Sequence, residues 1–363
     1  MIEKLSNHKI KTLTRISASQ YYSALGCPYK LVLANTFGYK QLLPSNANAH
    51  FGSVIHDMIE LISKGIVNNE QTFSETWISL IGKKENELKE RGLSSFTPLK
   101  YFVNDFALKK NQVKRILLKK QEKLNSTSKS SSNKYYTEKR LENSEKSIIG
   151  IADLIIENEF GTTIIDFKSG KIFSDSIDES GITEQGIKKE YEIQLKIYAH
   201  LYSLMTGSYP KSLFLVTLAN EFVEVEFTES DCENIYNEVL RFLSIMNSHI
   251  LKNDFASIAK PSVENCKYCS SRPACSFYST WLQINFEVVN DLFGTIEKVS
   301  HFNNDTVGLQ LEMQGKQVLI NNLPVEMKQK FESLIGKSIV LYNLKKSKQS
   351  LNATAGSFTV VYE

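Results

Sequence analysis

The chain has 363 residues, of which 42% are hydrophobic and 23% are charged. These proportions are ordinary for globular proteins, so they exclude a largely disordered or fibrous chain, and the length suggests two or three domains. The net charge of +3 says little by itself about partners.

The ends, apolar runs and cysteines of the chain bear on its location. No apolar run approaches the roughly 20 residues of a membrane helix. The first fifteen residues are polar and lack the apolar segment of a secretory signal. Five cysteines are an odd number and too few for a disulfide-stapled secreted scaffold. We therefore expect a cytoplasmic protein with reduced thiols and no membrane association.

The first third of the chain is predicted to be mostly helical. Helices are expected over residues 16–35, with a break at Pro28, over 52–64, and over much of 70–123, followed by a polar loop at 125–133. Twelve Lys/Arg and four Glu between Lys109 and Lys146 give a local charge of 12 − 4 = +8. This stretch is either a solvated helix face with a linker or a contact for a polyanion. Our hypothesis is that Lys109–Lys123 lines the path of a single DNA strand.

Strands then alternate with helices. Three β-branched runs within 134–168 predict a meander, residues 172–187 a loop, 188–206 a helix, 211–227 further strands and 230–253 a helix. From about residue 285, five short strands with a helical insert between the third and fourth suit a small closed barrel of the OB type, or an unrelated β appendage. The fold class is therefore α/β, a mixed sheet flanked by helices plus a small C-terminal β-barrel. We expect domains at 1–283, with a helical insert at about 64–134, and at 284–363.

Two predicted neighbouring strands carry acidic residues. Asp166 and Lys168 share one face of a strand, because residues i and i+2 point the same way, and an antiparallel neighbour can bring Asp153 alongside. Two carboxylates are ligands for Mg²⁺ or Mn²⁺, and a lysine beside them can orient a water for phosphodiester hydrolysis. The alternative is a cross-strand salt bridge on an exposed face.

Three more polar side chains fit the same kind of site. His56 lies in a predicted helix and can complete a carboxylate metal site, or it is structural. Gln194 and Tyr198 lie four residues apart on one helix face. They either hold a phosphate or base near the metal or form the polar edge of an amphipathic helix.

Three cysteines form the pattern C-x₂-C-x₅-C at Cys266, Cys269 and Cys275. Three thiolates make a partial metal site that needs a fourth ligand. The candidates are Cys27, in a break between helices, and Cys232, inside a predicted helix. We interpret Cys232 as a buried thiol of the hydrophobic core. A four-cysteine site holds either Zn²⁺ or an iron–sulfur cluster, and the spacing does not decide between them.

The order of these motifs resembles the RecB-like branch of the PD-(D/E)XK nuclease superfamily, over roughly residues 14–280. That branch has a helical His, GxxD, (D/E)xK and QxxxY, which match His56, Gly150 with Asp153, Asp166 with Lys168, and Gln194 with Tyr198. Glu138 resembles a less regular acidic position of the branch. The resemblance implies a restriction-endonuclease-like core. It also implies that the metal is bound by His56, Asp153, Asp166 and the Phe167 carbonyl. The catalytic residues that it implies are Lys168, Asp153 and Asp166. The residues that it implies for DNA contact are Gln194 and Tyr198.

A subset of the branch, including the AddB nuclease domain and CRISPR-adaptation exonucleases, carries a [4Fe–4S] cluster on one early Cys and a later C-x₂-C-x₅-C. The resemblance therefore implies a structural cluster on Cys27, Cys266, Cys269 and Cys275, with Zn²⁺ as the alternative.

These features predict a Mg²⁺- or Mn²⁺-dependent deoxyribonuclease that acts on single-stranded DNA or DNA ends. The alternatives are a catalytically silent DNA-binding subunit of a helicase or defence complex, and an Asp-x-Lys coincidence on a zinc scaffold. DNA repair, CRISPR adaptation and phage defence are all compatible settings. The sequence contains no P-loop, so unwinding would need a partner. Phe293, Phe302 and Tyr342 of the C-terminal region are available either to stack on bases or to fill its core.

Overall fold

The computed structural model describes residues 2–5, 8–90, 93–126, 134–177, 183–346 and 352–363. The chain forms two compact units. The central unit comprises Leu13–Leu25 and Ala47–Ser248, and the terminal unit comprises Met1–Thr12, Gly26–Asn46 and His249–Glu363. The domain boundary expected between residues 283 and 284 stays a prediction.

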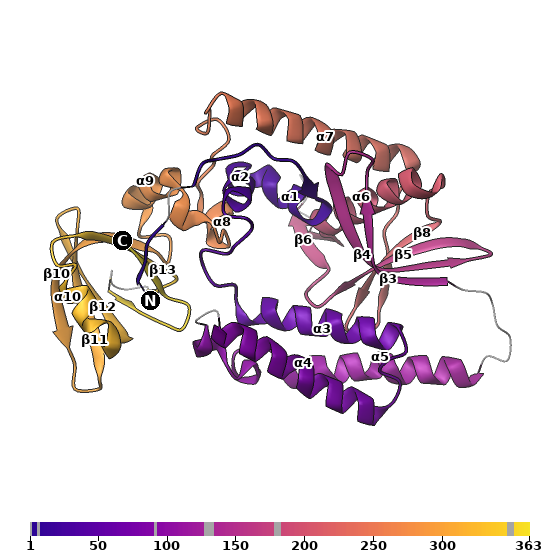
Figure 1. Ribbon diagram of the computed structural model, residues 1–363, viewed down its shortest axis with the longest axis horizontal. Helices are drawn as coiled ribbons and strands as arrows, with labels where there is room; N and C mark the ends of the chain where they lie inside the picture. Colours follow the sequence, from indigo (N-terminus) through magenta and orange to yellow (C-terminus); the bar gives the residue numbers. More distant parts are fainter. Residues whose placement is uncertain (1, 6–7, 91–92, 127–133, 178–182, 347–351) are drawn as a thin grey trace. The chain divides into compact units, whose positions relative to one another are not determined.

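A mixed sheet forms the core of the central unit (Figure 1). Its strand order is β2-β4-β5-β8-β9, and β3 also pairs with β4. The pairs β3–β4 and β4–β5 are antiparallel, which confirms the predicted meander, whereas β5–β8 is parallel. The strands are β2 (Ile16–Ser17), β3 (Lys134–Glu142), β4 (Ile148–Asn158), β5 (Gly161–Lys168), β8 (Ser212–Thr217) and β9 (Phe222–Glu224).

Helix α6 (Lys189–Thr206) connects the parallel strands β5 and β8 and packs against β3, β4, β5 and β8. A parallel pair needs such a crossover, because a tight turn can join only antiparallel neighbours. The helix ends at Gly207, whose φ of 83° is the left-handed conformation that glycine adopts without steric cost. The crossover thereby places one face of α6 over the strands that carry the acidic motifs.

The other helices of the central unit confirm the helical regions predicted there. Helix α3 packs against both α4 and α5, where Phe51, Trp77 and Phe106 form a cluster of aromatic rings. These helices are α1 (Ala18–Gly26), α3 (Ala47–Ser63), α4 (Glu70–Glu90), α5 (Phe106–Ser126) and α7 (Glu229–Leu251), with short 3₁₀ turns η1 (Ser94–Phe96) and η2 (Leu99–Tyr101).

The loop predicted over residues 172–187 is wrong. Strands β6 (Phe173–Ile177) and β7 (Thr183–Ile187) pair there as an antiparallel two-stranded sheet. The polar and acidic composition suggested a loop, but pairing satisfies backbone N–H and C=O groups whatever the side chains are. Residues 178–182 lie outside the described residues, as does most of the loop predicted at 125–133, whose residues 127–133 are not described.

The terminal unit joins a cysteine-rich helical segment to a curled sheet. The helical elements are α2 (Tyr29–Thr36), α8 (Val263–Lys267), η3 (Arg272–Ala274), α9 (Ser276–Asn285), η4 (Val325–Met327) and α10 (Lys328–Glu332). The strands are β1 (Ile2–Glu3), β10 (Leu292–His301), β11 (Thr306–Met313), β12 (Lys316–Pro324), β13 (Ser338–Tyr342), β14 (Lys345–Lys346), β15 (Ala353–Thr354) and β16 (Val360–Tyr362).

The connectivity of the curled sheet agrees with the predicted small barrel. Its order is β1-β16-β13-β10-β11-β12-β15-β14. The short strands β15 and β16 follow each other in the chain, yet β15 pairs in parallel with β12 and β16 pairs antiparallel with β13. The last segment therefore pairs with both ends of the four-stranded path β13-β10-β11-β12, and the sheet curls into a half-barrel with α10 between β12 and β13, while the closed OB-type barrel stays a prediction. Leu309, Leu311, Ile320 and Leu341 are among its fully buried core side chains.

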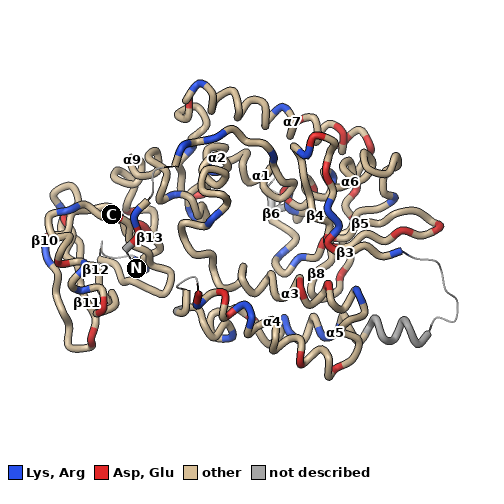
Figure 2. The backbone as a smooth tube through the Cα atoms, in the orientation of Figure 1, with Lys and Arg blue, Asp and Glu red and all other residues tan. Residues whose placement is uncertain are grey.

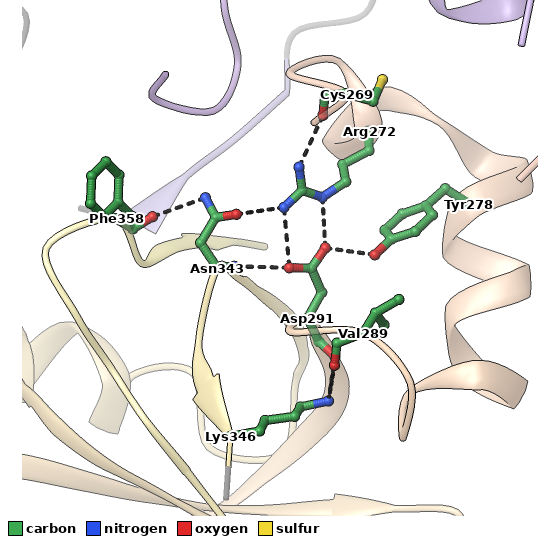
Figure 3. A network of polar contacts seen from close by, with 8 residues as sticks. All are labelled: Cys269, Arg272, Tyr278, Val289, Asp291, Asn343, Lys346 and Phe358. Atoms are coloured by element: carbon green, nitrogen blue, oxygen red, sulfur yellow. Dashed lines mark hydrogen bonds and ion pairs between the residues drawn. The ribbon is translucent and has the colours of Figure 1, made fainter. Parts of the chain in front are cut away.

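A buried ion pair ties the cysteine segment to this sheet within the terminal unit (Figure 3). Arg272 donates from Nε to Oδ2 of Asp291 at 2.6 Å and from Nη2 to Asn343 Oδ1 at 2.6 Å. Tyr278 also donates to Asp291, at 2.6 Å, and Arg272 donates to the Cys269 carbonyl at 3.0 Å. The guanidinium and the carboxylate are thus both buried and hydrogen-bonded, which is the condition for a buried ion pair to be tolerated.

A search of the described residues finds no helix with the length and apolar character needed to cross a membrane.

Candidate active site

Strand pairing places Glu138 of β3 opposite Asp153 of β4. Thr137 pairs with Leu154 and Lys139 with Ala152, so Glu138 and Asp153 face each other between these two pairs. Glu138 itself has a φ of 48°, which is unusual for a residue other than glycine. Such backbone conformations persist where the surrounding structure holds them, and they concentrate at functional sites.

The same register carries the row on to β5. The β4–β5 ladder ends at Leu154 with Ile165, and the next position along it sets Asp153 against Asp166. Beyond the ladder, the backbone N–H of Phe167 donates to Asp153 Oδ2 at 2.7 Å. Glu138, Asp153 and Asp166 therefore form one row across three adjacent strands, which we call the carboxylate row.

Helix α3 brings His56 to the carboxylate row. One ligand atom from each of His56, Glu138 and Asp153 lies within 4.8 Å of the others, and His56 Nδ1 is 3.5 Å from Asp153 Oδ2. The hydrogen bond to Asp153 raises the pKa of His56, and partial desolvation, together with the nearby Asp153 charge, raises the pKa of Glu138, although this residue is exposed. Nitrogen and carboxylate ligands at this spacing can hold a divalent cation once they are deprotonated.

Asp166 lies deeper, at the centre of a hydrogen-bonded network. Its Oδ1 accepts from Gln194 Nε2 at 3.2 Å, and its Oδ2 lies 2.5 Å from Lys168 Nζ. Lys168 also donates to Gln194 Oε1 at 3.2 Å, and Gln194 donates to the Tyr198 hydroxyl at 2.7 Å. Burial raises the pKa of Asp166 to about 6, although the charge of Lys168 acts in the opposite direction.

The residues of this network fit a bound cation. Asp166 Oδ2 is buried and, among the described residues, has an ion-pair contact with Lys168 but no partner in hydrogen-bonding geometry. A buried carboxylate oxygen in that state has only the Lys168 ammonium to offset its desolvation cost, and a divalent cation would offset it further. The donor set of carboxylate oxygens and one imidazole suits Mg²⁺ or Mn²⁺.

Gly150 of β4 makes room for Tyr198. A Cβ atom at position 150 would lie 2.4 Å from Tyr198 Cε1, closer than van der Waals contact permits. The ring is 3% exposed, so it cannot move aside into solvent. The glycine of the GxxD motif thus serves the tyrosine of the QxxxY motif, a relation that the spacing of either motif does not reveal.

Tyr191 is a site residue that the sequence analysis missed. The Lys168 ammonium lies 4.4 Å from the centroid of its ring, within the range of a cation–π contact. Tyr191 precedes Gln194 by three residues and Tyr198 by seven, so all three lie on one face of α6. That helical spacing was the available signal.

The four predicted cluster ligands line one small cavity in the terminal unit: Cys27, Cys266, Cys269 and Cys275. Backbone N–H groups donate to two of the sulfurs, Lys260 to Cys27 Sγ and Tyr278 to Cys275 Sγ, both at 3.3 Å. Burial raises the pKa of Cys266 to about 11 and that of Cys275 to about 12. Four sulfur donors around one cavity fit a soft metal or a cluster, whose binding would release the thiol protons.

Cys232 lies elsewhere. It is fully buried in α7 and is not among the residues that line the cysteine cavity. Burial raises the pKa of its thiol to about 12, as expected for the core thiol predicted from the sequence.

The basic stretch coincides with α5, and Lys and Arg recur along the described part of this helix (Figure 2). Lys114 pairs with Glu70 of α4 at 3.0 Å. The side chains of residues 119–123 are not described. The hypothesis that Lys109–Lys123 lines a strand path stays a prediction.

The mixed sheet of the central unit thus carries acidic residues and a lysine on adjacent strands, and helices pack against it. Residues 15–276 match the family profile described as "PD-(D/E)XK nuclease superfamily". Because that match covers most of the chain, the chain belongs to this superfamily.

One similar solved structure is the crystal structure of a protein named "Putative exonuclease" from Eubacterium rectale. The two chains are 13% identical, with a TM-score of 0.38 over 74% of this chain and 88% of that chain. A search of the curated proteins gives no match.

Proposed function

We propose that this protein is a divalent-metal-dependent deoxyribonuclease of the RecB-like branch that cleaves phosphodiester bonds in single-stranded DNA or at DNA ends. The observation that carries the proposal is the carboxylate row with Lys168 beside it. Three acidic side chains from three strands would repel one another without a cation between them. Superfamily membership supports the reaction class, and the identity of the substrate and its strandedness are part of the proposal.

His56, Asp153 and Asp166 would hold Mg²⁺ or Mn²⁺, with the Phe167 carbonyl as a further oxygen ligand and Glu138 completing the row. When bound, the cation lowers the pKa of a coordinated water and offsets the charge that develops on the phosphate. The Phe167 N–H holds the Asp153 carboxylate in place by its 2.7 Å hydrogen bond. This hydrogen bond orients one of the proposed ligands before a metal binds.

Lys168 would act on the attacking water and on the phosphate. Its Nζ is held by Asp166 and by the Gln194 side chain, so the ammonium is positioned before substrate binds. A fixed positive charge near the phosphate stabilises the negative charge of the transition state. Gln194 contacts both Asp166 and Lys168, so it sets the distance between them, and Tyr198 holds Gln194.

The test compares Lys168→Ala with Lys171→Ala on end-labelled single-stranded DNA in Mg²⁺, Mn²⁺ or EDTA. Lys171 is a nearby exposed lysine and serves as the matched control. We expect metal-dependent cleavage by the wild type and by Lys171→Ala, and a loss of at least about 100-fold in Lys168→Ala. Cleavage that survives in Lys168→Ala would refute the assignment of that lysine.

The same assay separates the alternative function. DNA binding by the wild type without any metal-dependent cleavage would indicate the catalytically silent subunit considered above. A helicase or defence-complex partner stays a prediction in either case.

We further propose a [4Fe–4S] cluster on Cys27, Cys266, Cys269 and Cys275, with Zn²⁺ as the alternative occupant. The shared cavity and the N–H donors to two sulfurs support a cluster site, since such hydrogen bonds are typical of iron–sulfur centres. The measurement is iron, sulfide and zinc content after anaerobic purification. Cys27→Ser should lower the iron content, whereas Cys232→Ser should not. Stoichiometric zinc without iron would contradict the cluster.

A further inference from the structure

A second cavity lies in the terminal unit, at the end of the curled sheet where β10 turns into β11. It measures about 460 Å³. The described residues that line it are one aromatic ring, four amides and one hydroxyl: Phe302, Asn303, Asn304, Thr306, Asn321 and Asn322. None of these side chains is charged, so the lining favours a flat, neutral group with hydrogen-bonding edges.

A β-bulge presents two of the amides to this cavity. Val307 pairs with Leu323 but Leu309 pairs with Ile320, so two residues of β12 stand opposite the single residue Gly308. Those two residues are Asn321 and Asn322, and Asn322 has a φ of 64°. Bulges of this kind redirect side chains next to binding sites.

Gly308 seats the aromatic ring. A Cβ atom at position 308 would lie 2.6 Å from Phe302 Cε2 and 2.8 Å from Cζ. The ring therefore rests directly on the glycine backbone, while the side chain remains partly exposed at the cavity. By contrast, Tyr342, another aromatic considered for stacking, is 2% exposed and belongs to the core.

One amide oxygen in this cavity lacks a partner. Asn321 Oδ1 is buried and accepts no hydrogen bond from any described residue. Its neighbour Asn322 uses its amide nitrogen to donate to the Ala355 carbonyl at 3.0 Å. An unpaired buried acceptor costs free energy, and because this oxygen is closed off from solvent, a ligand donor would reach it only after the Asn321 side chain turns towards the cavity.

We propose that this cavity binds a nucleobase of single-stranded DNA, with Phe302 as the stacking surface and the asparagine amides reading the base edge. Bases in single strands are recognised by aromatic stacking together with hydrogen bonds to their exposed edges. None of the described residues that line the cavity is basic, so the recognised group is the base and not the phosphate. The choice of DNA as the ligand rests on the proposed nuclease function. The presence and lining of the cavity do not depend on that function.

The test measures binding of a labelled single-stranded oligonucleotide to the full-length protein in buffer without divalent metal. Phe302→Ala should weaken binding about tenfold, since one base stack is worth that order of affinity. Asn303→Ala changes an exposed loop residue, and it should weaken binding about threefold, because the loss of one hydrogen bond costs about that much affinity. Ile335→Ala removes an exposed apolar side chain of the same unit that does not line the cavity, and it should bind like the wild type.

A base-directed readout complements the affinities. Irradiation of the complex with an oligonucleotide that contains 5-iodouracil should cross-link the base to Phe302, identified by peptide mass spectrometry. Unchanged affinity in both Phe302→Ala and Asn303→Ala would overturn the proposal and leave the cavity to a sugar or protein ligand. The nuclease proposal is judged separately, by metal-dependent cleavage that depends on Lys168, so either proposal can fail while the other stands.

Discussion

At the scale of single residues, Gly150 leaves room for the ring of Tyr198 because glycine has no Cβ atom. A methyl group at this position would overlap the buried ring of Tyr198. We expect Gly150→Ala to lower the free energy of unfolding by about 1–3 kcal/mol, the usual cost of overpacking. Urea unfolding measures this, and in a Tyr198→Ala background the same change should cost little. An equal cost in both backgrounds would show that the ring is not the cause.

Asp166 makes stability depend on pH. Burial raises its folded-state pKa to about 6, above the roughly 3.9 of an unfolded aspartate. The folded protein therefore holds this proton more tightly, and the stability that Asp166 contributes is greatest below about pH 4 and is lost as pH rises through about 6.

We expect Asp166→Asn, which mimics the protonated acid, to be more stable than the wild type at pH 7 by about 1–3 kcal/mol without divalent metal. The difference should shrink towards pH 4. Urea unfolding at both pH values measures it, and a difference that does not change with pH would rule out titration of Asp166 as the cause. The cleavage activity of this variant should be lost, because the asparagine cannot supply a charged ligand.

At the scale of elements, strand β3 holds Glu138 in a left-handed conformation while pairing continues on both sides of it. Glycine adopts that conformation freely, so Glu138→Gly should keep or raise stability by up to about 1 kcal/mol. Glu138→Gln keeps the backbone strain and removes the charge. Both variants should bind Mn²⁺ more weakly in calorimetry, and Glu138→Gly should be more stable than Glu138→Gln, because both lose the charge and only the glycine also relieves the backbone strain. A clear loss of stability in Glu138→Gly would refute the argument from strain.

Helix α6 is the element that assembles the proposed active-site network. Its residues Tyr191, Gln194 and Tyr198 lie on one face. The Tyr191 ring contacts Lys168, and Gln194 is hydrogen-bonded to both Asp166 and Lys168. The Tyr198 ring packs against the backbone of Gly150. Because α6 also packs on β3, β4 and β5, the helix and the carboxylate row are fixed relative to each other by the core of the central unit.

At the scale of the whole chain, the terminal unit collects residues that are far apart in sequence. Cys27 meets a group of cysteines that begins 239 residues later (266 − 27), and Arg272 and Asp291 join that segment to the C-terminal sheet. A cluster held at this point would cross-link the two ends of the chain's long central segment.

The buried ion pair of Figure 3 gives a test at this scale. Asp291→Ala leaves Arg272 charged and buried, so we expect it to destabilise the terminal unit by about 3–5 kcal/mol. The control is Glu287→Ala, which breaks an exposed pair with Lys316 and should cost less than about 1 kcal/mol. Thermal unfolding of both variants measures the difference. Similar melting temperatures of the two variants would contradict the larger contribution to stability that we assign to the buried ion pair.

The sequence by itself determined the helices, the meander and the order of its motifs, because helical and strand periodicities are local properties of the chain. It also singled out His56, Asp153, Asp166 and Lys168, whose chemistry and spacing are visible without a fold. For the same reason it separated Cys232, inside an amphipathic helix, from the other cysteines.

Only the tertiary structure decided which of these residues meet. The row formed by Glu138, Asp153 and Asp166 depends on strand register, and the contact of Tyr191 with Lys168 depends on how α6 packs. The hairpin β6–β7 formed where composition indicated a loop, since backbone pairing does not require apolar side chains. The cavity at Phe302 depends on a bulge opposite Gly308. Pairing, register and packing join residues distant in sequence, so no local pattern encodes them.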